Sequence, residues 1–301
     1  MTSWDQVTTP AERLRALVVD EVPPELTEPR AWQKAPTPSL PSALRDLWGA
    51  RQVVRTVTER NLRVRYKQSF LGFAWALLTP VGLLCGLLIL FHRVAGVASS
   101  DGVPYSLFAY VGLLAWTFFS VSTSMGGNSV LNDKALLSKS RFPREVFPLS
   151  SVGVAGVDAV MALVPLAVLF VIERRLPSAT TPVAVVPLLV LVAFTTGIAL
   201  GSSAVIVHLR DLRLALPILL QIGLFLSPVA YGLDTIPAWG RLAYCFVNPV
   251  APVIDGFRRT VLEGEMPQWG YLAAGAVTAS VVLVGGYALF KRLEGSFADV
   301  A

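Results

Sequence analysis

The first residues that indicate a binding role form a basic cluster directly before a long uncharged stretch. The cluster lies in RNLRVRYK and consists of Arg60, Arg63, Arg65 and Lys67, and the uncharged stretch that follows is 70–91. Cationic side chains attract anionic lipid headgroups, and Lys/Arg clusters beside a membrane span stay in the cytoplasm. The pattern predicts headgroup contacts and a chain that enters the membrane from the cytoplasmic side. It gives no reason to expect a nucleic-acid partner.

A single acid, Asp158, lies inside another stretch that is otherwise uncharged, 146–172. Ionisable side chains within a membrane span are expensive and commonly functional. A proton relay would need polar partners, and the sequence shows none. The alternative is a protonated or hydrogen-bonded aspartate that faces the interior of a helix bundle, so no mechanism is assigned to this residue.

The residues that usually carry enzymatic chemistry form no cluster in this sequence. The two histidines, His92 and His208, are expected at opposite membrane faces, and the two cysteines, Cys85 and Cys245, lack metal-ligand spacing. A GxxxxGK[ST] phosphate loop is absent from the sequence. We therefore expect no catalytic residue, metal or cofactor in this chain, and if ATP powers its activity, a separate subunit must bind ATP and Mg.

The apolar stretches that must position these residues are long enough to cross a membrane. Of all residues, 54% are hydrophobic and only 15% are charged, and a span needs ~20 apolar residues to cross ~30 Å of hydrocarbon. The stretches that qualify are 70–91, 103–131, 146–172, 181–207, 214–231 and 271–290. The sequence predicts an all-α polytopic membrane protein with six transmembrane helices, in a transmembrane domain at 68–292.

The distribution of Lys and Arg predicts the orientation of these spans. Most basic residues fall in the loops that this topology places in the cytoplasm. The outer segments hold fewer, among them Arg174, Arg175, Arg258 and Arg259. We expect a multi-pass plasma (cell inner) membrane protein with both termini in the cytoplasm, including a tail at 293–301.

Two further segments are predicted to lie at the membrane surfaces. Within 40–67, Leu40, Leu44, Leu47, Trp48, Val54 and Val57 recur at helical spacing with charged residues between them, which predicts an amphipathic interfacial helix. Residues 1–39 are rich in Pro and Glu and are expected to be a flexible cytoplasmic extension. The segment 232–268 is apolar but interrupted by proline and glycine, which favours re-entrant helices near the outer face over a folded extracellular cap.

Aromatic side chains gather on one face of the second predicted span. Tyr105, Phe108, Trp116 and Phe119 fall near one face of a helix, and Phe118 lies beside them. Aromatic rings stack well on the apolar faces of sugars, which would suit a substrate path. Packing within the protein or against lipid explains the same pattern, and both interpretations stay open.

Several segments together resemble the membrane subunit of bacterial ABC-type polysaccharide exporters, the family that handles O-antigen, teichoic acid and galactan. The segments are RNLRVRYKQSFLGFAWALLTP, LLAWTFF, LLSKSRFPREVFPLS, HLRDLRLALPILLQIGLFLSPVAY, NPVAPVIDGFR and FKRLEGSFADVA. Their order and spacing cover the chain from residue 60 to the C-terminus. The stretch before Leu40 departs from the family pattern.

The resemblance implies a homodimer whose six-span subunits enclose a channel, driven by two copies of a separate nucleotide-binding subunit. The implied substrate is a glycan linked to a polyprenyl pyrophosphate. The candidates for lining the channel are then Phe73, Tyr105, Phe108, Trp116, Phe118 and Phe119. Weak, repeated stacking would suit a long polymer that must bind and leave many times.

The resemblance also assigns roles on the cytoplasmic side. It places a coupling loop at 132–145, seated in a groove of the ATPase, with the candidate residues Asn132, Lys134, Lys139, Arg141, Phe142, Pro143 and Arg144. It makes the amphipathic helix at 40–67 a gate helix. Arg63, Arg65 and Lys67 become candidates to attract the pyrophosphate of the lipid carrier, beside their role in topology and headgroup contact.

Two other classes of protein remain open. A drug or lipid exporter permease of the same superfamily would share the fold and the ATPase partner, and would respond to amphiphiles instead of glycans. A membrane-embedded glycosyltransferase or acyltransferase would need a catalytic cluster, which the sequence lacks.

Overall fold

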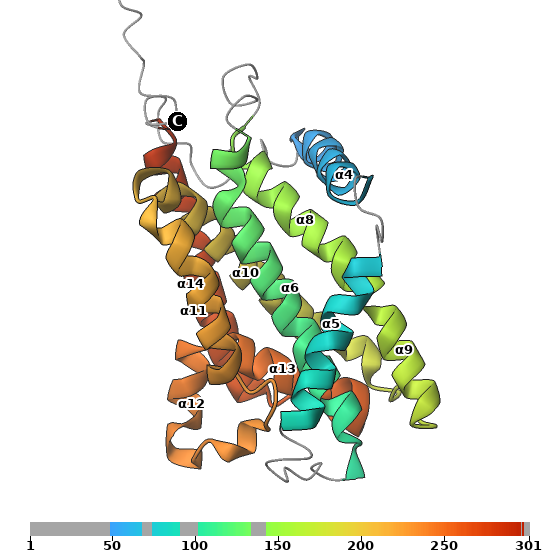
Figure 1. Cartoon of the computed structure of the whole chain (residues 1–301). Coiled ribbons are helices and arrows are strands. Elements are labelled where there is room, and N and C mark those ends of the chain that lie inside the picture. The colour runs from blue at the N-terminus through green and yellow to red at the C-terminus, as the bar shows by residue number, and fades with distance from the viewer. Residues whose placement is uncertain (1–48, 68–73, 91–101, 134–142, 296, 298–301) are drawn as a thin grey trace, which may run out of the picture. The chain divides into compact units, whose positions relative to one another are not determined.

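Every regular element in the part of the chain that the structure describes is a helix. The computed structural model describes residues 49–67, 74–90, 102–133, 143–295 and 297, which belong to one unit of the chain, Ser39–Ala301. In chain order, and as labelled in Figure 1, the helices are α4 (Arg51–Lys67), α5 (Ala74–Leu87), α6 (Tyr105–Asn132), α8 (Val146–Met161), α9 (Leu163–Ile172), η4 (Thr181–Ala184), α10 (Val185–His208), α11 (Asp211–Leu226), η5 (Leu233–Thr235), α12 (Ala238–Val247), α13 (Val250–Arg258), η6 (Arg259–Glu263) and α14 (Trp269–Glu294). The predicted all-α fold is confirmed for these residues.

Four helical stretches are long and apolar enough to cross a membrane. They are Tyr105–Asn132, Val146–Ile172, Thr181–His208 and Trp269–Glu294. The helices at the predicted first and fifth spans are shorter within the described residues, namely the apolar helix Leu77–Leu90 and the 16-residue α11. A helix of this length extends about 24 Å, less than the ~30 Å of a hydrocarbon core. Four predicted spans are thus matched in length and composition, and the other two stay predictions.

α11 ends earlier than the predicted span 214–231. Its last residue is Leu226, and Ser227 has an extended backbone with φ −86° and ψ 148°. The next residue is Pro228, whose ring disfavours helical backbone at the residue before it. The expected helix end is therefore wrong, and 227–231 forms a turn that offers its carbonyl oxygens to other partners.

A proline also divides the third predicted span. α8 and α9 are separated at Ala162, shortly before Pro165. Because Pro165 has no N–H, the carbonyl of Met161 lacks its usual helical donor. The Tyr110 hydroxyl in α6 donates to the carbonyl oxygen of Ala162 at 2.9 Å, so a neighbouring helix satisfies a carbonyl at the break.

α6 is the central helix of the bundle (Figure 1). It contacts α5, α8, α9, α10, α11 and α13, and it supplies many residues of the main hydrophobic cluster. Leu107, Tyr110 and Leu113 are completely buried. α6 is therefore the helix around which most of the described bundle is packed.

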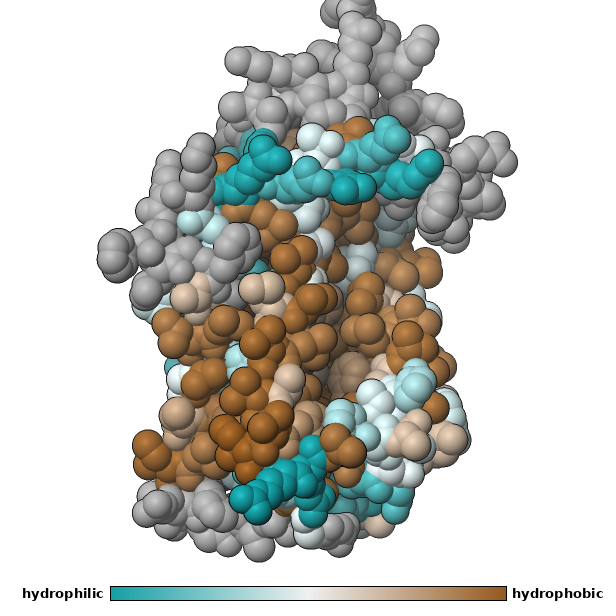
Figure 2. Space-filling model, turned by 90° about the vertical axis from the view of Figure 1, so that its right-hand side faces the viewer, coloured by the Kyte–Doolittle hydropathy of each residue, from teal (hydrophilic) through white to brown (hydrophobic). Residues whose placement is uncertain are grey.

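The two ends of the bundle differ in composition. One end carries the end of α6, the start of α8 and the ends of α10 and α14 (Figure 1), and we call it the basic end because Arg144, Arg210 and Lys291 lie there. The opposite end carries the start of α6, the end of α11, and helices α12 and α13, and we call it the α13 end. Figure 2 shows a face that is apolar through its middle, with hydrophilic residues gathered toward the ends.

The predicted amphipathic helix is present as α4 in its described part, while 40–48 lies outside the described residues. Val57 is buried together with Ala50 and with Val146 at the start of α8, and Val54 packs beside them. The opposite face, which includes Arg51 and Arg55, is exposed. The amphipathic pattern is confirmed for α4, which uses its apolar face to pack on α8.

The predicted segment 232–268 contains the short helices α12 and α13, separated at Asn248 and Pro249. The second is packed against α6, α10 and α14, whereas most side chains of α12 are exposed, including Trp239 and Val247. The prediction of short, interrupted helices is confirmed, and their entry into the membrane stays a prediction.

α10 and α14 cross so closely that glycine is required where they touch. A Cβ atom on Gly286 would lie 2.2 Å from the carbonyl oxygen of Gly197, and one on Gly197 would lie 2.6 Å from the backbone nitrogen of Leu283. Small residues allow helix backbones to approach in a membrane, where van der Waals packing holds helices together. The contact fixes α14 against α10.

Substitution of Gly286 by alanine tests this crossing. The added methyl group must push the two backbones apart, and overpacking of this kind typically costs about 1–3 kcal/mol. Thermal unfolding of the purified protein in detergent should show a lower midpoint for Gly286→Ala. Gly285→Ala is the matched control, because a Cβ atom there meets nothing within 4 Å. Equal midpoints for the two variants would contradict the close crossing.

Candidate functional site

Asp158 in α8 is held by the end of α4. Nη1 of Arg65 lies 2.8 Å from Asp158 Oδ2, and the Tyr66 hydroxyl donates a hydrogen bond to Oδ1. The same nitrogen of Arg65 lies 3.3 Å from Sδ of Met125 in α6. The Asp158 side chain is only 14% exposed, against 40% for Arg65. Three helices therefore meet at one ion pair.

Tyr66 supplies the neutral donor of this group. Burial, together with the hydrogen bond to Asp158, raises the pKa of Tyr66 to about 12. The phenol therefore keeps its proton at neutral pH and remains a donor. The sequence shows no partner for Asp158, whereas in the structure Arg65 and Tyr66 reach it from 93 and 92 residues away. The geometry supports the hydrogen-bonded alternative.

The basic cluster is divided among different partners instead of forming one site. Nη2 of Arg60 lies 2.6 Å from Oδ1 of Asp133, directly after the end of α6. Arg65 is paired with Asp158, whereas Arg63 is exposed and has no ion pair with any described residue. The side chain of Lys67 lies outside the described part. Of the three predicted phosphate contacts, only Arg63 is thus described without a competing carboxylate.

The predicted coupling residues are described only at the two edges of their loop. Asn132 is the exposed last residue of α6, and Pro143 and Arg144 precede α8. The Arg144 guanidinium donates to the carbonyl oxygen of Glu294 in the last turn of α14. The residues Lys134, Lys139, Arg141 and Phe142 lie outside the described residues. Each edge of the loop is therefore tied to the bundle, Asp133 to α4 and Arg144 to α14.

The aromatic side chains of α6 are packed within the chain. Tyr105, Phe108, Trp116, Phe118 and Phe119 are each at most 9% exposed. The ring of Trp116 lies 5.3 Å from that of Phe119, measured between centroids, and Phe119 stacks on Phe194 of α10 at 5.5 Å. This arrangement is what the packing interpretation expects. The sixth candidate, Phe73, lies outside the described residues.

Arg258, expected as a charge in an outer loop, is instead buried at the α13 end with 2% of its surface exposed. Its Nε donates to the carbonyl oxygen of Phe108 at 3.0 Å. Its other nitrogens donate to the carbonyl oxygens of Pro228 at 2.8 Å, Val229 at 2.6 Å and Tyr231 at 2.9 Å. One guanidinium thereby joins α13, the start of α6 and the turn after α11.

The Arg258 guanidinium lies against an aromatic ring and in the space left by a glycine. The guanidinium carbon lies 3.5 Å from the centroid of the Phe108 ring, a cation–π contact. A Cβ atom on Gly112 would lie 2.8 Å from Nη2 of Arg258, so the absence of a side chain at Gly112 makes the room. The sequence contains Arg258 and Gly112, but it does not show that they meet, because that contact depends on packing between distant segments.

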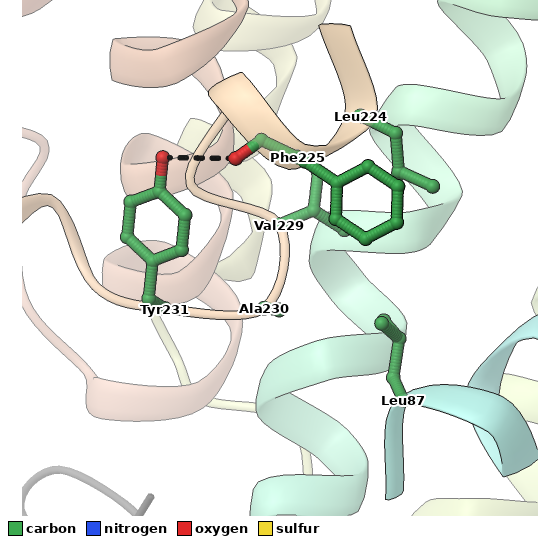
Figure 3. A pocket seen from close by; sticks show the side chains of 6 residues that line it. All are labelled: Leu87, Leu224, Phe225, Val229, Ala230 and Tyr231. Carbon is green, nitrogen blue, oxygen red and sulfur yellow. Dashed lines mark hydrogen bonds between the residues drawn. The ribbon is translucent and has the colours of Figure 1, made fainter. Parts of the chain in front are cut away.

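A small apolar cavity lies beside this turn (Figure 3). Its volume is about 120 Å³, and it is lined by Leu87 of α5, Leu224 and Phe225 of α11, and Val229, Ala230 and Tyr231 of the turn. The Tyr231 hydroxyl donates to the carbonyl oxygens of Phe225 at 3.4 Å and Leu226 at 2.8 Å, which satisfies the end of α11. The lining is apolar apart from the Tyr231 hydroxyl, which is already bonded to the end of α11.

A helix bundle with four helices long and apolar enough to cross a membrane fits a membrane-embedded protein, and the family comparison agrees with this. The chain belongs to the ABC-2 type transporter family, whose model matches residues 52–262. The match includes α4, the central α6 and the short helices at the α13 end.

Individual relatives are similar over most of the chain. An O-antigen export system permease protein RfbA from Myxococcus xanthus is 30% identical over 260 residues, covering 85% of this chain and 98% of the relative. A protein of the same name from Klebsiella pneumoniae is 26% identical, covering 81% and 93%. The polysialic acid transport protein KpsM of Escherichia coli is 24% identical, covering 78% and 91%.

A double-mutant cycle on Arg65 and Asp158 tests the ion pair between α4 and α8. If Arg65→Ala and Asp158→Ala act on one interaction, their effects on stability should be non-additive, with a coupling of about 0.5–3 kcal/mol. The free energy of unfolding would be measured for both single variants and the double variant in detergent. Arg63→Ala with Asp158→Ala is the control cycle and should be additive. Additive effects in the Arg65 cycle would contradict the pairing.

Replacement of Arg258 tests the junction at the α13 end. Arg258→Met should destabilise the protein strongly, because each buried carbonyl left without a donor costs about 1–3 kcal/mol. Arg258→Lys should recover only part of the loss, since one ammonium cannot reproduce the guanidinium fork. Thermal unfolding would compare both with Arg259→Met, whose side chain bonds, among the described residues, only to Glu265 and Met266. A midpoint of Arg258→Met equal to that of Arg259→Met would disprove the junction.

Proposed function

We propose that this chain is the membrane (permease) subunit of an ATP-driven exporter that moves a lipid-linked polysaccharide across the plasma membrane. The observation that carries the proposal is the similarity to an O-antigen export permease over 98% of that relative's length. Membership of the ABC-2 type transporter family supports the transport role. O-antigen, teichoic acid and galactan are the classes of glycan that fit the resemblance of the sequence.

ATP hydrolysis belongs to a separate subunit in this proposal. The sequence has no phosphate loop of its own, and a transporter of this kind needs an energy source. The working assembly is a homodimer of the permease with two copies of the nucleotide-binding subunit, which hold ATP and Mg. Each permease crosses the membrane six times with both termini in the cytoplasm, and the basic end of the bundle faces the ATPase.

The loop at 132–145 is the proposed contact with the ATPase. Its basic residues and its position between two long-range connections of the basic end support this role. Asp133 is bonded to Arg60 of α4, and Arg144 is bonded to the last turn of α14. A displacement of the loop would therefore reach both α4 and α14.

The proposed dimer face involves α5 and α11, which both contact the central α6. Apolar side chains of these helices are exposed, including Leu78 and Leu83 of α5 and Leu219 and Ile222 of α11. The cavity in Figure 3 lies between the same two helices. A second copy of the chain would cover this apolar surface and would place the substrate path between the subunits.

For the predicted substrate contacts, the described geometry supports different roles. Arg63 is exposed and has no carboxylate partner in the described part of the chain, which suits a phosphate or pyrophosphate of the lipid carrier. Arg65 already neutralises Asp158, so we propose that it positions α4. For the aromatic residues of α6 we propose packing within the subunit as the main role, because their rings are buried.

Affinity purification of the tagged chain from its native membranes in mild detergent tests the proposed function. We expect a P-loop subunit in stoichiometric amount, and ATP hydrolysis that is stimulated by the lipid-linked glycan fraction of those membranes. Stimulation by amphiphilic drugs instead of glycans would indicate a drug or lipid exporter. Turnover of a glycosyl or acyl donor by the chain alone, without an ATPase, would indicate an enzyme and would overturn the proposal.

A further inference from the structure

A second buried charge lies at the basic end, directly before α8. Glu145 is only 2% exposed, although it occupies a cap position where a carboxylate usually meets water. A carboxylate beside the N-terminus of a helix is favoured by the helix dipole. Burial nevertheless removes its hydration, so the group needs a cation or several donors.

α14 supplies that cation. Nζ of Lys291 forms an ion pair with Oε1 of Glu145, and the Tyr287 hydroxyl, one turn earlier, lies 3.5 Å from the same oxygen. Lys291 also lies 3.0 Å from Oε2 of Glu294, so the ammonium connects two carboxylates. Oε2 of Glu145 has no hydrogen-bond partner among the described residues. The pair is well buried on the glutamate side and accessible on the lysine side.

The neighbouring residue reaches the same turn of α14. Arg144 donates to the carbonyl oxygen of Glu294, at the end of α14 where carbonyls lack helical donors. Two consecutive residues before α8 therefore bind the last turn of α14. Glu145 pairs with the side chain of Lys291, and the Arg144 side chain donates to the backbone carbonyl of Glu294. Beneath them, Phe290 packs edge-on against Phe297, with the ring centroids 5.4 Å apart.

We propose that Glu145 and Lys291 form a linkage through which the start of α8 and the last turn of α14 move as one body during transport. The proposal rests on the proposed function, since it concerns how movement from an ATPase at the basic end enters the bundle. Both residues are positioning residues and touch no substrate. The linkage extends a movement at α8 to the helix that is fixed to α10 by Gly286.

Stability alone gives a weak reason for such a pair. Replacing a buried ion pair by apolar residues of similar volume is often neutral or stabilising, whereas removal of one partner leaves an uncompensated charge. An ion pair adds a directional connection that apolar packing lacks. If the pair serves only stability, an apolar pair at these positions should leave transport unchanged. If the pair couples α8 to α14, an apolar pair should reduce transport although the protein remains folded.

The test uses the full chain in complex with its ATPase, reconstituted in vesicles with the lipid-linked glycan fraction of the source membranes. The readout is the amount of glycan moved per ATP hydrolysed. The double variant Glu145→Met/Lys291→Met should assemble and hydrolyse ATP normally but move about tenfold less glycan per ATP, within the usual range of coupling between sites. Lys291→Met should also be uncoupled, and Lys291→Arg should keep the wild-type ratio because a guanidinium retains the charge.

Arg292→Gln is the matched control, because Arg292 lies on the same turn, is exposed and should leave the ratio unchanged. A wild-type ratio in the apolar double variant would overturn the linkage and leave the proposed function intact. A loss of assembly in the apolar double variant would also overturn it, because the pair would then serve folding. A wild-type complex that hydrolyses ATP without moving glycan would remove the proposed function, and the linkage with it.

Discussion

The positive charge of Arg258 must be kept inside an apolar bundle, and the construction of the α13 end follows from that constraint. A buried guanidinium is tolerable only when its N–H groups are bonded, and four backbone carbonyls supply the acceptors. The turn after α11 can offer three of them because Pro228 stops the helix. The guanidinium can approach because Gly112 has no side chain. A proline, a glycine and an arginine that are far apart in the sequence thus form one arrangement.

Arg258 and the ion pairs of the basic end hold charge in different ways. The acceptors of Arg258 are backbone carbonyls. At the basic end Arg60 is paired with the side chain of Asp133, and Lys291 with that of Glu145. The partly exposed Arg60–Asp133 pair can break and form again at modest cost, whereas separating the buried Glu145 from Lys291 would leave an uncompensated charge. The two pairs at the same end of the bundle therefore differ in how easily they rearrange.

Local patterns in the sequence predicted the elements well, because length, hydropathy and proline positions act within one helix. The long apolar runs correspond to α6, α8 with α9, α10 and α14, and the spacing of Val54 and Val57 identified the packed face of α4. The partners of Asp158 and Arg258 could not be found in this way, since they lie up to 150 residues away. Such pairings depend on how helices are placed beside one another. The aromatic face of α6 was visible in the sequence, but only burial could favour packing over a substrate path.

The position of α14 after the helices it packs against has a consequence for biosynthesis. Chains are made from the N-terminus, so the helices from α4 to α13 are synthesised before α14. Until α14 docks, Glu145 lacks its lysine partner, and the surface of α10 around Gly197 lacks the helix that covers it. Docking of α14 supplies both at once.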